Sequence, residues 1–296
     1  MSDKFMNIRA LFQKLLLQED LNFLLTNRIP RIGLTRFMGW WSQIRHPWVV
    51  KSSMAVWRLF SDLDLSDSKT QKFDSLHACF TRELVDGARP VWPDPECMTS
   101  PCDAIVGALG RIEKGQVFQA KGFPYSLSSL LGDSPACLNS AQHLEGGTYI
   151  TLRLTSSMYH RFHAPQDVSL HHVTYISGDV WNVNPVALKR VAELFCKNER
   201  AVLHLQTLDG VPFLVVPVAA VLVASMRLHA VDVLLNLRYK GPNEIPCQAQ
   251  YIKGQEMGWF EHGSTLLIFV PPGFELAPGI ELGRTIRMGQ ALLRRL

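Results

Sequence analysis

The feature that most constrains the fold is a series of short apolar runs that occupies the chain beyond Pro90. Gly, Pro and other turn residues punctuate the chain around these runs, which read AIVGALGRI, TYITLRL, VSLHHVTYISG, AVLHLQTL, FLVVPVAAVLVASM and STLLIFVPPG. Runs of this length and spacing are typical of strands that are joined by turns. The chain beyond Pro90 is therefore predicted to fold as a mostly antiparallel β core.

The longest apolar run, Val211 to Met226, is the best candidate for a membrane span. It has 16 residues, whereas a helix needs about 20 to cross the hydrocarbon core. Pro212 and Pro217 would also break a helix at these positions. The Val-rich composition favours buried strands instead, so no stretch of the chain is predicted to span a membrane.

The first 58 residues differ in charge from the rest of the chain. They contain nine Lys and Arg against three Asp and Glu, a net charge of +6, whereas the whole chain carries +4 and the remainder is therefore −2. Four of the seven tryptophans lie in the same stretch. From Phe5 to Asn27 apolar residues recur at intervals of three and four, which predicts a helix that Pro30 ends.

A second basic and aromatic segment runs from Arg31 to Trp48. This composition suits a surface helix in the headgroup layer of a bilayer, and it suits equally an amphipathic helix packed on the protein's own core. Shorter helices are predicted at Asp74–Thr81 and Pro185–Cys196. The expected fold class is α+β, with an N-terminal helical, membrane-associating segment at 1–70 and a second domain at 71–296.

Three distant segments contribute the side chains that suggest chemistry: Asp103 in SPCDAIVGALG, His160 and His163 in YHRFHAP, and Ser264 in KGQEMGWFEHGST. Each alone also fits a structural role, such as a cap or a turn. Together, a carboxylate that orients an imidazole and an imidazole that takes a serine proton form a hydroxyl-activating triad. The GxSxG elbow of many hydrolases is absent. Gly263 instead permits a strained turn whose carbonyl the serine hydroxyl can attack.

A metal-dependent hydrolase is the competing interpretation of the same residues. His160, His163 and Asp103 would be the zinc ligands, with His171, His172 or His262 as a further ligand. An HxxH pair on a strand or loop has awkward ligand geometry, however, and no base for a metal-bound water stands out. The six cysteines lack paired zinc-ribbon spacing and are expected to be reduced thiols. We therefore predict no metal site.

Several longer motifs occur in a fixed order along most of the chain. They are FTRELVDGARP at 80–90, SPCDAIVGALG at 100–110, KGFPYSLSSLLG at 121–132, YHRFHAP at 159–165, NPVAL at 184–188, NERAVL at 198–203 and KGQEMGWFEHGST at 253–265. In these motifs, from about Phe80 to Phe269, the chain resembles the phosphatidylserine decarboxylase family of pyruvoyl-dependent enzymes. The resemblance implies that 71–296 is a catalytic decarboxylase domain.

The resemblance also implies a role for each candidate residue. Ser264 matches the self-processing serine, which attacks the Gly263 carbonyl, forms an ester and then eliminates, so that residue 264 becomes a pyruvoyl group. His163 matches the processing base, Asp103 the carboxylate that orients it, and His160 the histidine of the decarboxylation step. Decarboxylation of an amino acid needs an electron sink that ordinary side chains lack. A pyruvoyl ketone supplies one by forming a Schiff base with the amine of phosphatidylserine.

Four residues depart from the family pattern. His262 stands before Gly263 where Leu is more usual, and Ala104, Ala219 and Ala224 replace glycines. None of these changes removes a group with an expected chemical role.

The expected partners are phosphatidylserine, an anionic membrane surface and, after cleavage, the β chain (Met1–Gly263) and α chain (Ser264–Leu296) of one precursor. The family resemblance implies a homodimer, and no nucleic-acid partner is expected. Each basic residue near an anionic bilayer contributes about 1 kcal/mol of attraction. We therefore expect peripheral attachment to the cytoplasmic face of the inner membrane. A non-catalytic lipid-binding homologue with the same fold is the remaining alternative.

Overall fold

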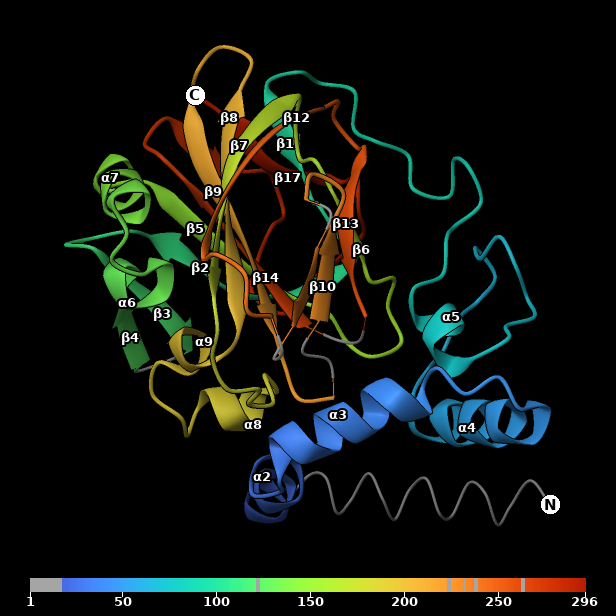
Figure 1. Cartoon of the computed structure of the whole chain (residues 1–296). Helices are drawn as coiled ribbons and strands as arrows, with labels where there is room; N and C mark the ends of the chain where they lie inside the picture. Colours follow the sequence, from blue (N-terminus) through green and yellow to red (C-terminus); the bar gives the residue numbers. More distant parts are fainter. Residues whose placement is uncertain (1–17, 121–122, 223–224, 232, 237–238, 262–263) are drawn as a thin grey trace.

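The computed structural model describes residues 18–120, 123–222, 225–231, 233–236, 239–261 and 264–296. Its central feature is an eight-stranded sheet in which all neighbouring strands are antiparallel (Figure 1). In spatial order the strands are β12 (Glu244–Tyr251), β7 (Val168–Ile176), β8 (Arg200–Thr207), β9 (Pro212–Ala219), β14 (Ser264–Val270), β5 (Thr148–Arg153), β2 (Ala104–Arg111) and β16 (Thr285–Ile286).

Three smaller antiparallel sheets accompany it. One has four strands, β11 (Leu234–Asn236), β10 (Ser225–Leu228), β13 (Glu256–Phe260) and β6 (Arg161–His163); the second has β1 (Cys97–Thr99), β17 (Ala291–Arg295) and β15 (Phe274–Leu276); the third has β3 (Gln116–Ala120) and β4 (Phe123–Ser126). The prediction of an α+β fold with a mostly antiparallel core is confirmed.

The central strands of the eight-stranded sheet are buried on both faces, which explains why β14 is apolar from Leu266 to Val270. Leu266 and Ile268 face the cluster of side chains shared with the four-stranded and three-stranded sheets. Leu267 and Phe269 face a second cluster that includes residues of the short helices beside the sheet. Because successive side chains of a strand point to opposite faces, a strand buried on both sides has no polar alternation.

The run from Val211 to Met226 forms strands, as predicted. It supplies β9, whose residues after Pro212 are all buried, and the start of β10. Among the residues that the structure describes, no helix combines the length and the apolar character needed to cross a bilayer.

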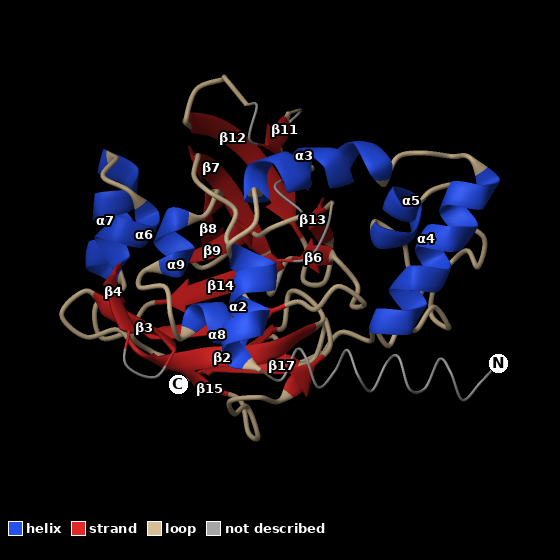
Figure 2. Cartoon of the chain, turned by 90° about the horizontal axis from the view of Figure 1, so that it is seen from below, coloured by secondary structure: helices blue, strands red, loops and turns tan. Residues whose placement is uncertain are grey.

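The N-terminal helices lie together beneath the strand ends (Figures 1 and 2). They are α2 (Glu19–Asn27), α3 (Arg31–Trp41), α4 (Pro47–Phe60) and α5 (Leu76–Phe80). The helix predicted at Phe5–Asn27 is confirmed from Glu19 onward, and its residues before position 18 lie outside the described residues. The short helix predicted at Asp74–Thr81 is confirmed as α5, which the Ser75 hydroxyl caps by accepting a hydrogen bond from the Ala78 amide at 3.0 Å.

The single helix expected from Arg31 to Trp48 is interrupted. Helix α3 ends at Trp41, and α4 starts at Pro47. Proline is well suited to the first turn of a helix, where its missing amide hydrogen has no helical partner. This signal was available in the sequence, but the helix that follows Pro47 was not predicted.

The helix predicted at Pro185–Cys196 is wrong as one element. The structure has two four-residue helices, α8 (Pro185–Leu188) and α9 (Leu194–Lys197). The buried Gln119 side chain separates them, because its amide donates to the Leu188 and Val191 carbonyls at 2.8 and 2.7 Å and its oxygen accepts from the Leu194 amide at 2.6 Å. These bonds replace helical ones between the two segments.

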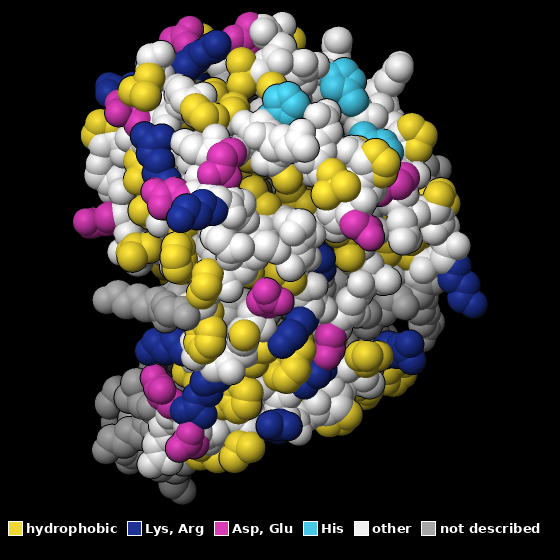
Figure 3. All heavy atoms as spheres, turned by 90° about the vertical axis from the view of Figure 1, so that its left-hand side faces the viewer, with side chains coloured by type: hydrophobic (Ala, Val, Ile, Leu, Met, Phe, Trp, Pro, Cys, Tyr) yellow, Lys and Arg dark blue, Asp and Glu magenta, His cyan; other side chains and the backbone are white. Residues whose placement is uncertain are grey.

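Two further helices were not predicted, α6 (Leu127–Leu131) and α7 (Pro135–His143). Each has a serine N-cap that accepts a backbone hydrogen bond, Ser126 for α6 and Ser134 for α7. They cover one face of the large sheet, and acidic and basic side chains are interspersed over this side of the molecule (Figure 3).

Replacing Gln119 with Ala is expected to lower the free energy of unfolding by about 3 kcal/mol, because two buried carbonyls and one buried amide lose their partner. Urea unfolding of the purified protein measures this. The partly exposed Gln166 donates one bond, to the Pro95 carbonyl, so the matched Gln166→Ala variant should change stability by less than about 0.5 kcal/mol. Equal effects of the two substitutions would contradict the proposed cause of the helix break.

Candidate functional site

Ser264 is the first residue of β14, a central strand of the large sheet. Its Cα lies opposite Ala219 of β9, and the next residue, Thr265, lies between Val218 and Arg153. Of the family departures, Ala219 is thus the direct strand partner of Ser264. His262, Gly263 and Ala224 lie outside the described residues, so the expected scissile bond does too.

The strand that precedes Ser264 positions both candidate histidines. In the pairing of β13 with β6, Glu256 lies opposite His163. At the other end of β13 the Phe260 amide donates to the His160 carbonyl at 3.0 Å. Glu256 and Phe260 are four positions apart, about 13 Å along a strand. His160 therefore lies at the end of β13 that leads to Ser264, and His163 lies at the opposite end.

His160 is fully buried in an aromatic environment. Its Nδ1 lies 2.7 Å from the Met158 carbonyl oxygen. Since a carbonyl can only accept, Nδ1 carries a proton, and Nε2 is the nitrogen that can exchange one. The ring centroids of Phe80 and the imidazole are 4.2 Å apart, and Trp57 of α4 stacks on Phe80 with a centroid separation of 5.1 Å. These contacts fix the orientation of the ring from the side of the N-terminal helices.

His163 is buried in a polar environment. Its Nδ1 donates to the Gly254 carbonyl at 2.8 Å, and its Nε2 accepts from the Tyr159 hydroxyl at 3.0 Å. Burial lowers the pKa of His163 below its ordinary value, although the Gly254 carbonyl and the charge of Glu256 act in the opposite direction. The ring is therefore a neutral base near neutral pH.

The Asp103 carboxylate is held by an arginine and a backbone amide. Arg89 binds both oxygens, with Nε at 2.9 and 3.1 Å and Nη2 at 2.7 Å, and the Met288 amide donates at 2.8 Å. Desolvation lowers the pKa of Arg89, but its hydrogen bonds and charge interactions with Asp103 and Asp67 outweigh this and raise it. Bidentate pairs of this kind are strong and orient both groups.

The structure brings the Asp103 and His163 segments together, since the His163 amide donates to the Pro101 carbonyl at 2.8 Å. The described partners of the two side chains are nevertheless different groups: Arg89 for Asp103, and Gly254 and Tyr159 for the His163 ring. Sequence reasoning missed Arg89 and Tyr159. Both lie inside the quoted motifs, FTRELVDGARP and YHRFHAP, which was the signal available for finding them.

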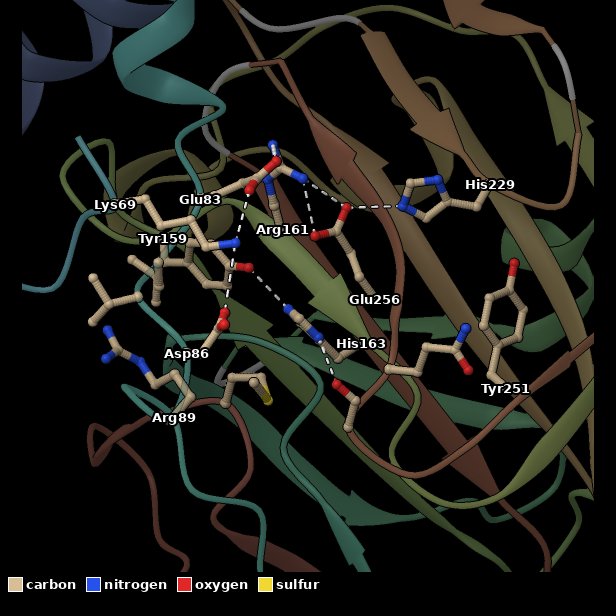
Figure 4. Close-up of a pocket in the computed structure, with 16 residues that line it drawn as sticks. Lys69, Glu83, Asp86, Arg89, Tyr159, Arg161, His163, His229, Tyr251 and Glu256 are labelled. Atoms are coloured by element: carbon tan, nitrogen blue, oxygen red, sulfur yellow. Dashed lines mark hydrogen bonds and ion pairs between the residues drawn. The ribbon is translucent and has the colours of Figure 1, made fainter. Parts of the chain in front are cut away.

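A polar cavity of about 710 Å³ opens beside His163 (Figure 4). Glu256 connects two groups that line this cavity. Its carboxylate accepts a hydrogen bond from Arg161 at 2.9 Å and lies 2.8 Å from the His229 ring nitrogen Nε2. Glu83 also pairs with Arg161, at 3.5 Å, and with Lys69 at 3.1 Å. The charges that line this cavity thus form ion pairs with one another.

A second cavity, of about 740 Å³ and mostly apolar, lies between the N-terminal helices and the strand ends. Phe80, which contacts His160, and Arg153, which is the strand partner of Thr265, both line it. This cavity is therefore adjacent to the Ser264 end of β14, and its apolar wall includes Trp57 and Val56 of α4. Its lining suits the apolar part of a lipid.

The geometry gives no support to a metal-dependent hydrolase. Both ring nitrogens of His163 have other partners, and Asp103 is bound by Arg89. Within the described ranges, no group of three or more His, Cys, Asp or Glu side chains is arranged to hold a metal ion.

Comparison with known proteins gives a consistent result. The family described as phosphatidylserine decarboxylase matches residues 76–294. The phosphatidylserine decarboxylase proenzyme of Pseudomonas fluorescens is 35% identical over 275 residues, which cover 89% of this chain and 93% of that protein. The proenzyme of Brevibacillus brevis is 33% identical over 90% of this chain and 95% of its own length. The chain therefore belongs to the phosphatidylserine decarboxylase family.

Proposed function

We propose that this chain is a phosphatidylserine decarboxylase proenzyme. It cleaves itself between Gly263 and Ser264 and then converts phosphatidylserine to phosphatidylethanolamine and CO2. The observation that carries the proposal is the position of Ser264, which begins a central strand at the point where His160 and a lipid-sized apolar cavity meet. The relatives named as proenzymes of this activity support it, and nothing favours a non-catalytic homologue.

Self-cleavage would begin when the Ser264 hydroxyl attacks the Gly263 carbonyl carbon, which exchanges the amide for an ester. Loss of the Ser264 Cα proton then breaks the Cβ–O bond and releases Gly263 as a carboxylate. Water converts the remaining unsaturated residue to a pyruvoyl group and ammonia. In this proposal His163 is the base, as the family resemblance implies and as its neutral buried ring allows, although the structure places it at the end of β13 away from Ser264. Asp103 orients the base-bearing segment from its site beside Arg89.

The pyruvoyl group supplies the electron sink for decarboxylation. A pyruvoyl group at residue 264 would be held beside the apolar cavity, because the strand that follows it pairs with β9 on one side and β5 on the other. We propose that His160 delivers the proton that replaces CO2. A buried imidazole with one nitrogen fixed by the Met158 carbonyl presents its other nitrogen in a defined direction.

The first prediction on this site concerns the two histidines. His163→Ala should leave a full-length chain of 296 residues, whereas His160→Ala should cleave but release no CO2. Intact-mass measurement and CO2 release separate the two steps, and Ser264→Ala provides the uncleaved reference. If His160→Ala failed to cleave while His163→Ala cleaved normally, the base would be His160, which lies at the end of β13 that leads to Ser264.

The pH dependence of cleavage provides a second test. Because burial lowers the pKa of His163, the neutral base persists to lower pH than a free imidazole, whose pKa is about 6.5. The cleavage rate of precursor made by cell-free synthesis should therefore stay constant from pH 8 to about 6.5 and fall only below that. A rate that already halves above pH 7 would contradict a lowered pKa for the base.

We also propose that α3 and α4 attach the enzyme to an anionic bilayer surface at the cytoplasmic face of the inner membrane. Large apolar side chains on these helices are exposed, including Trp40 at 62% and Trp48 at 77%. Exposed cations without ion pairs among the described residues accompany them: Arg28, Arg36, Arg45, Lys51 and Arg58. This combination is typical of interfacial helices.

The division at residue 70 fits this proposal, with 1–70 as the membrane-associating segment and 71–296 as the catalytic domain. The family match, which begins at residue 76, supports it. From the family resemblance we further propose a homodimer of processed protomers, each with its β and α chains, and the native mass of the processed protein tests it.

Replacing Trp40 and Trp48 with Ser should weaken binding to phosphatidylglycerol-containing vesicles by about tenfold or more, because both side chains lose apolar contact with the bilayer. Vesicle co-sedimentation measures this, and higher salt should weaken the wild-type protein further. Trp92 is 51% exposed and lies outside these helices, so Trp92→Ser is the matched control. Equal loss of binding in the control would refute the proposed surface.

A further inference from the structure

Arg153 is the last residue of β5, and its position in the sheet is next to the reaction centre. Its Cα lies opposite Thr265 of β14 on one side and Ile105 of β2 on the other. The guanidinium is therefore attached one strand away from the residue that directly follows Ser264.

Within the described part of the chain, the guanidinium of Arg153 lacks a protein partner. Among the residues that the structure describes, it forms no ion pair or hydrogen bond, and burial alone lowers its pKa. The buried arginines elsewhere are different. Arg200 donates to the Leu130 carbonyl at 2.6 Å and Arg82 to the Ser157 carbonyl at 2.9 Å. A partly buried cation without a partner is costly unless a ligand supplies the counter-charge.

Arg153 also lines two cavities. One is the apolar cavity of about 740 Å³ between α4 and the strand ends, and the other, of about 500 Å³, lies against β2, β5 and α8. Thr151 and Thr265 line the second cavity, and both hydroxyl oxygens are buried without a hydrogen-bond partner. Buried polar groups normally have hydrogen-bond partners. A polar ligand near Arg153 would supply partners for these two hydroxyls.

We propose that Arg153 binds the phosphodiester of the phospholipid substrate, with the apolar part of the lipid in the cavity between α4 and the strand ends. This inference rests on the proposed function. A serine phospholipid has an amine, a carboxylate and a phosphodiester. The amine reacts and the carboxylate leaves as CO2, so a cation bound to the carboxylate would stabilise the ground state more than the transition state. The phosphodiester keeps its charge throughout the reaction, and a guanidinium matches it with paired donors.

The kinetic test compares Arg153→Met and Arg153→Lys with wild type after intact-mass measurement has shown cleavage in each. With monomeric dihexanoyl phosphatidylserine, Arg153→Met should raise KM about tenfold to a hundredfold at similar kcat, as expected for loss of a charged hydrogen bond. Arg153→Lys should recover part of this. Arg111→Met removes the same charge from an exposed site at the far end of β2 and should leave KM unchanged. An unchanged KM in Arg153→Met, or an equal rise in the control, would overturn the proposal.

A substrate change identifies the group that Arg153 binds. A neutral analogue of dihexanoyl phosphatidylserine, with the phosphate methylated, should be turned over with the same kcat/KM by wild type and Arg153→Met. If Arg153→Met had a lower kcat/KM than wild type on this analogue, Arg153 would be assigned to the carboxylate instead, and the proposal would be overturned.

A binding measurement separates this inference from the proposed function. Dihexanoyl phosphatidylglycerol has the phosphodiester but no amine, so calorimetric titration reports binding even if the protein releases no CO2. Wild type should bind it about tenfold or more tightly than Arg153→Met. Equal binding by both proteins, or inorganic phosphate binding as tightly as the lipid, would overturn a phospholipid site at Arg153. Absence of CO2 release by wild type, in contrast, would contradict only the proposed function.

Discussion

The backbone pairing of β14 is the constraint on which the rest of the structure depends. Its residues pair with β9 on one side and β5 on the other from the first positions of the strand. The proposed scissile bond precedes Ser264, so its cleavage would remove none of these pairings. Downstream, β16 pairs with β2 and β17 pairs with β1. The C-terminal 33 residues would therefore remain part of the same sheets after the chain is cut.

A row of aromatic contacts connects this strand end to the helices that we assign to the membrane. Trp57 of α4 stacks on Phe80 of α5, and Phe80 contacts the His160 ring. Because buried side chains are closely packed, movement of α4 would be transmitted to the imidazole. The surface that we propose to contact lipid and the group that we propose as proton donor thus belong to one packed unit, which suits an enzyme whose substrate arrives from a bilayer.

Sequence patterns predicted the strands well because burial of the central strands on both faces leaves a continuous apolar signal. They also singled out the residues of the proposed site, Asp103, His160, His163 and Ser264, which all lie in motifs of the family and whose roles stay predictions. What they missed depends on contacts between distant residues. Gln119 interrupts a helix that is about 70 positions away in the chain, and a local pattern contains no information on such a contact. The different surroundings of the two histidines likewise follow from the pairing of β6 with β13, not from the three-residue spacing.

The basic and aromatic segment illustrates how two interpretations left open by the sequence can both hold. Helix α3 is attached to the core, because Thr35 is buried and its hydroxyl accepts from the Leu222 amide at 2.9 Å, while Arg31 pairs with Asp179 at 2.6 Å. Trp40 of the same helix is exposed. One face of an amphipathic helix can thus pack on protein while another remains available to lipid. Attachment to the core also fixes where the exposed face points, and it places the apolar cavity directly behind the helices that would contact the bilayer.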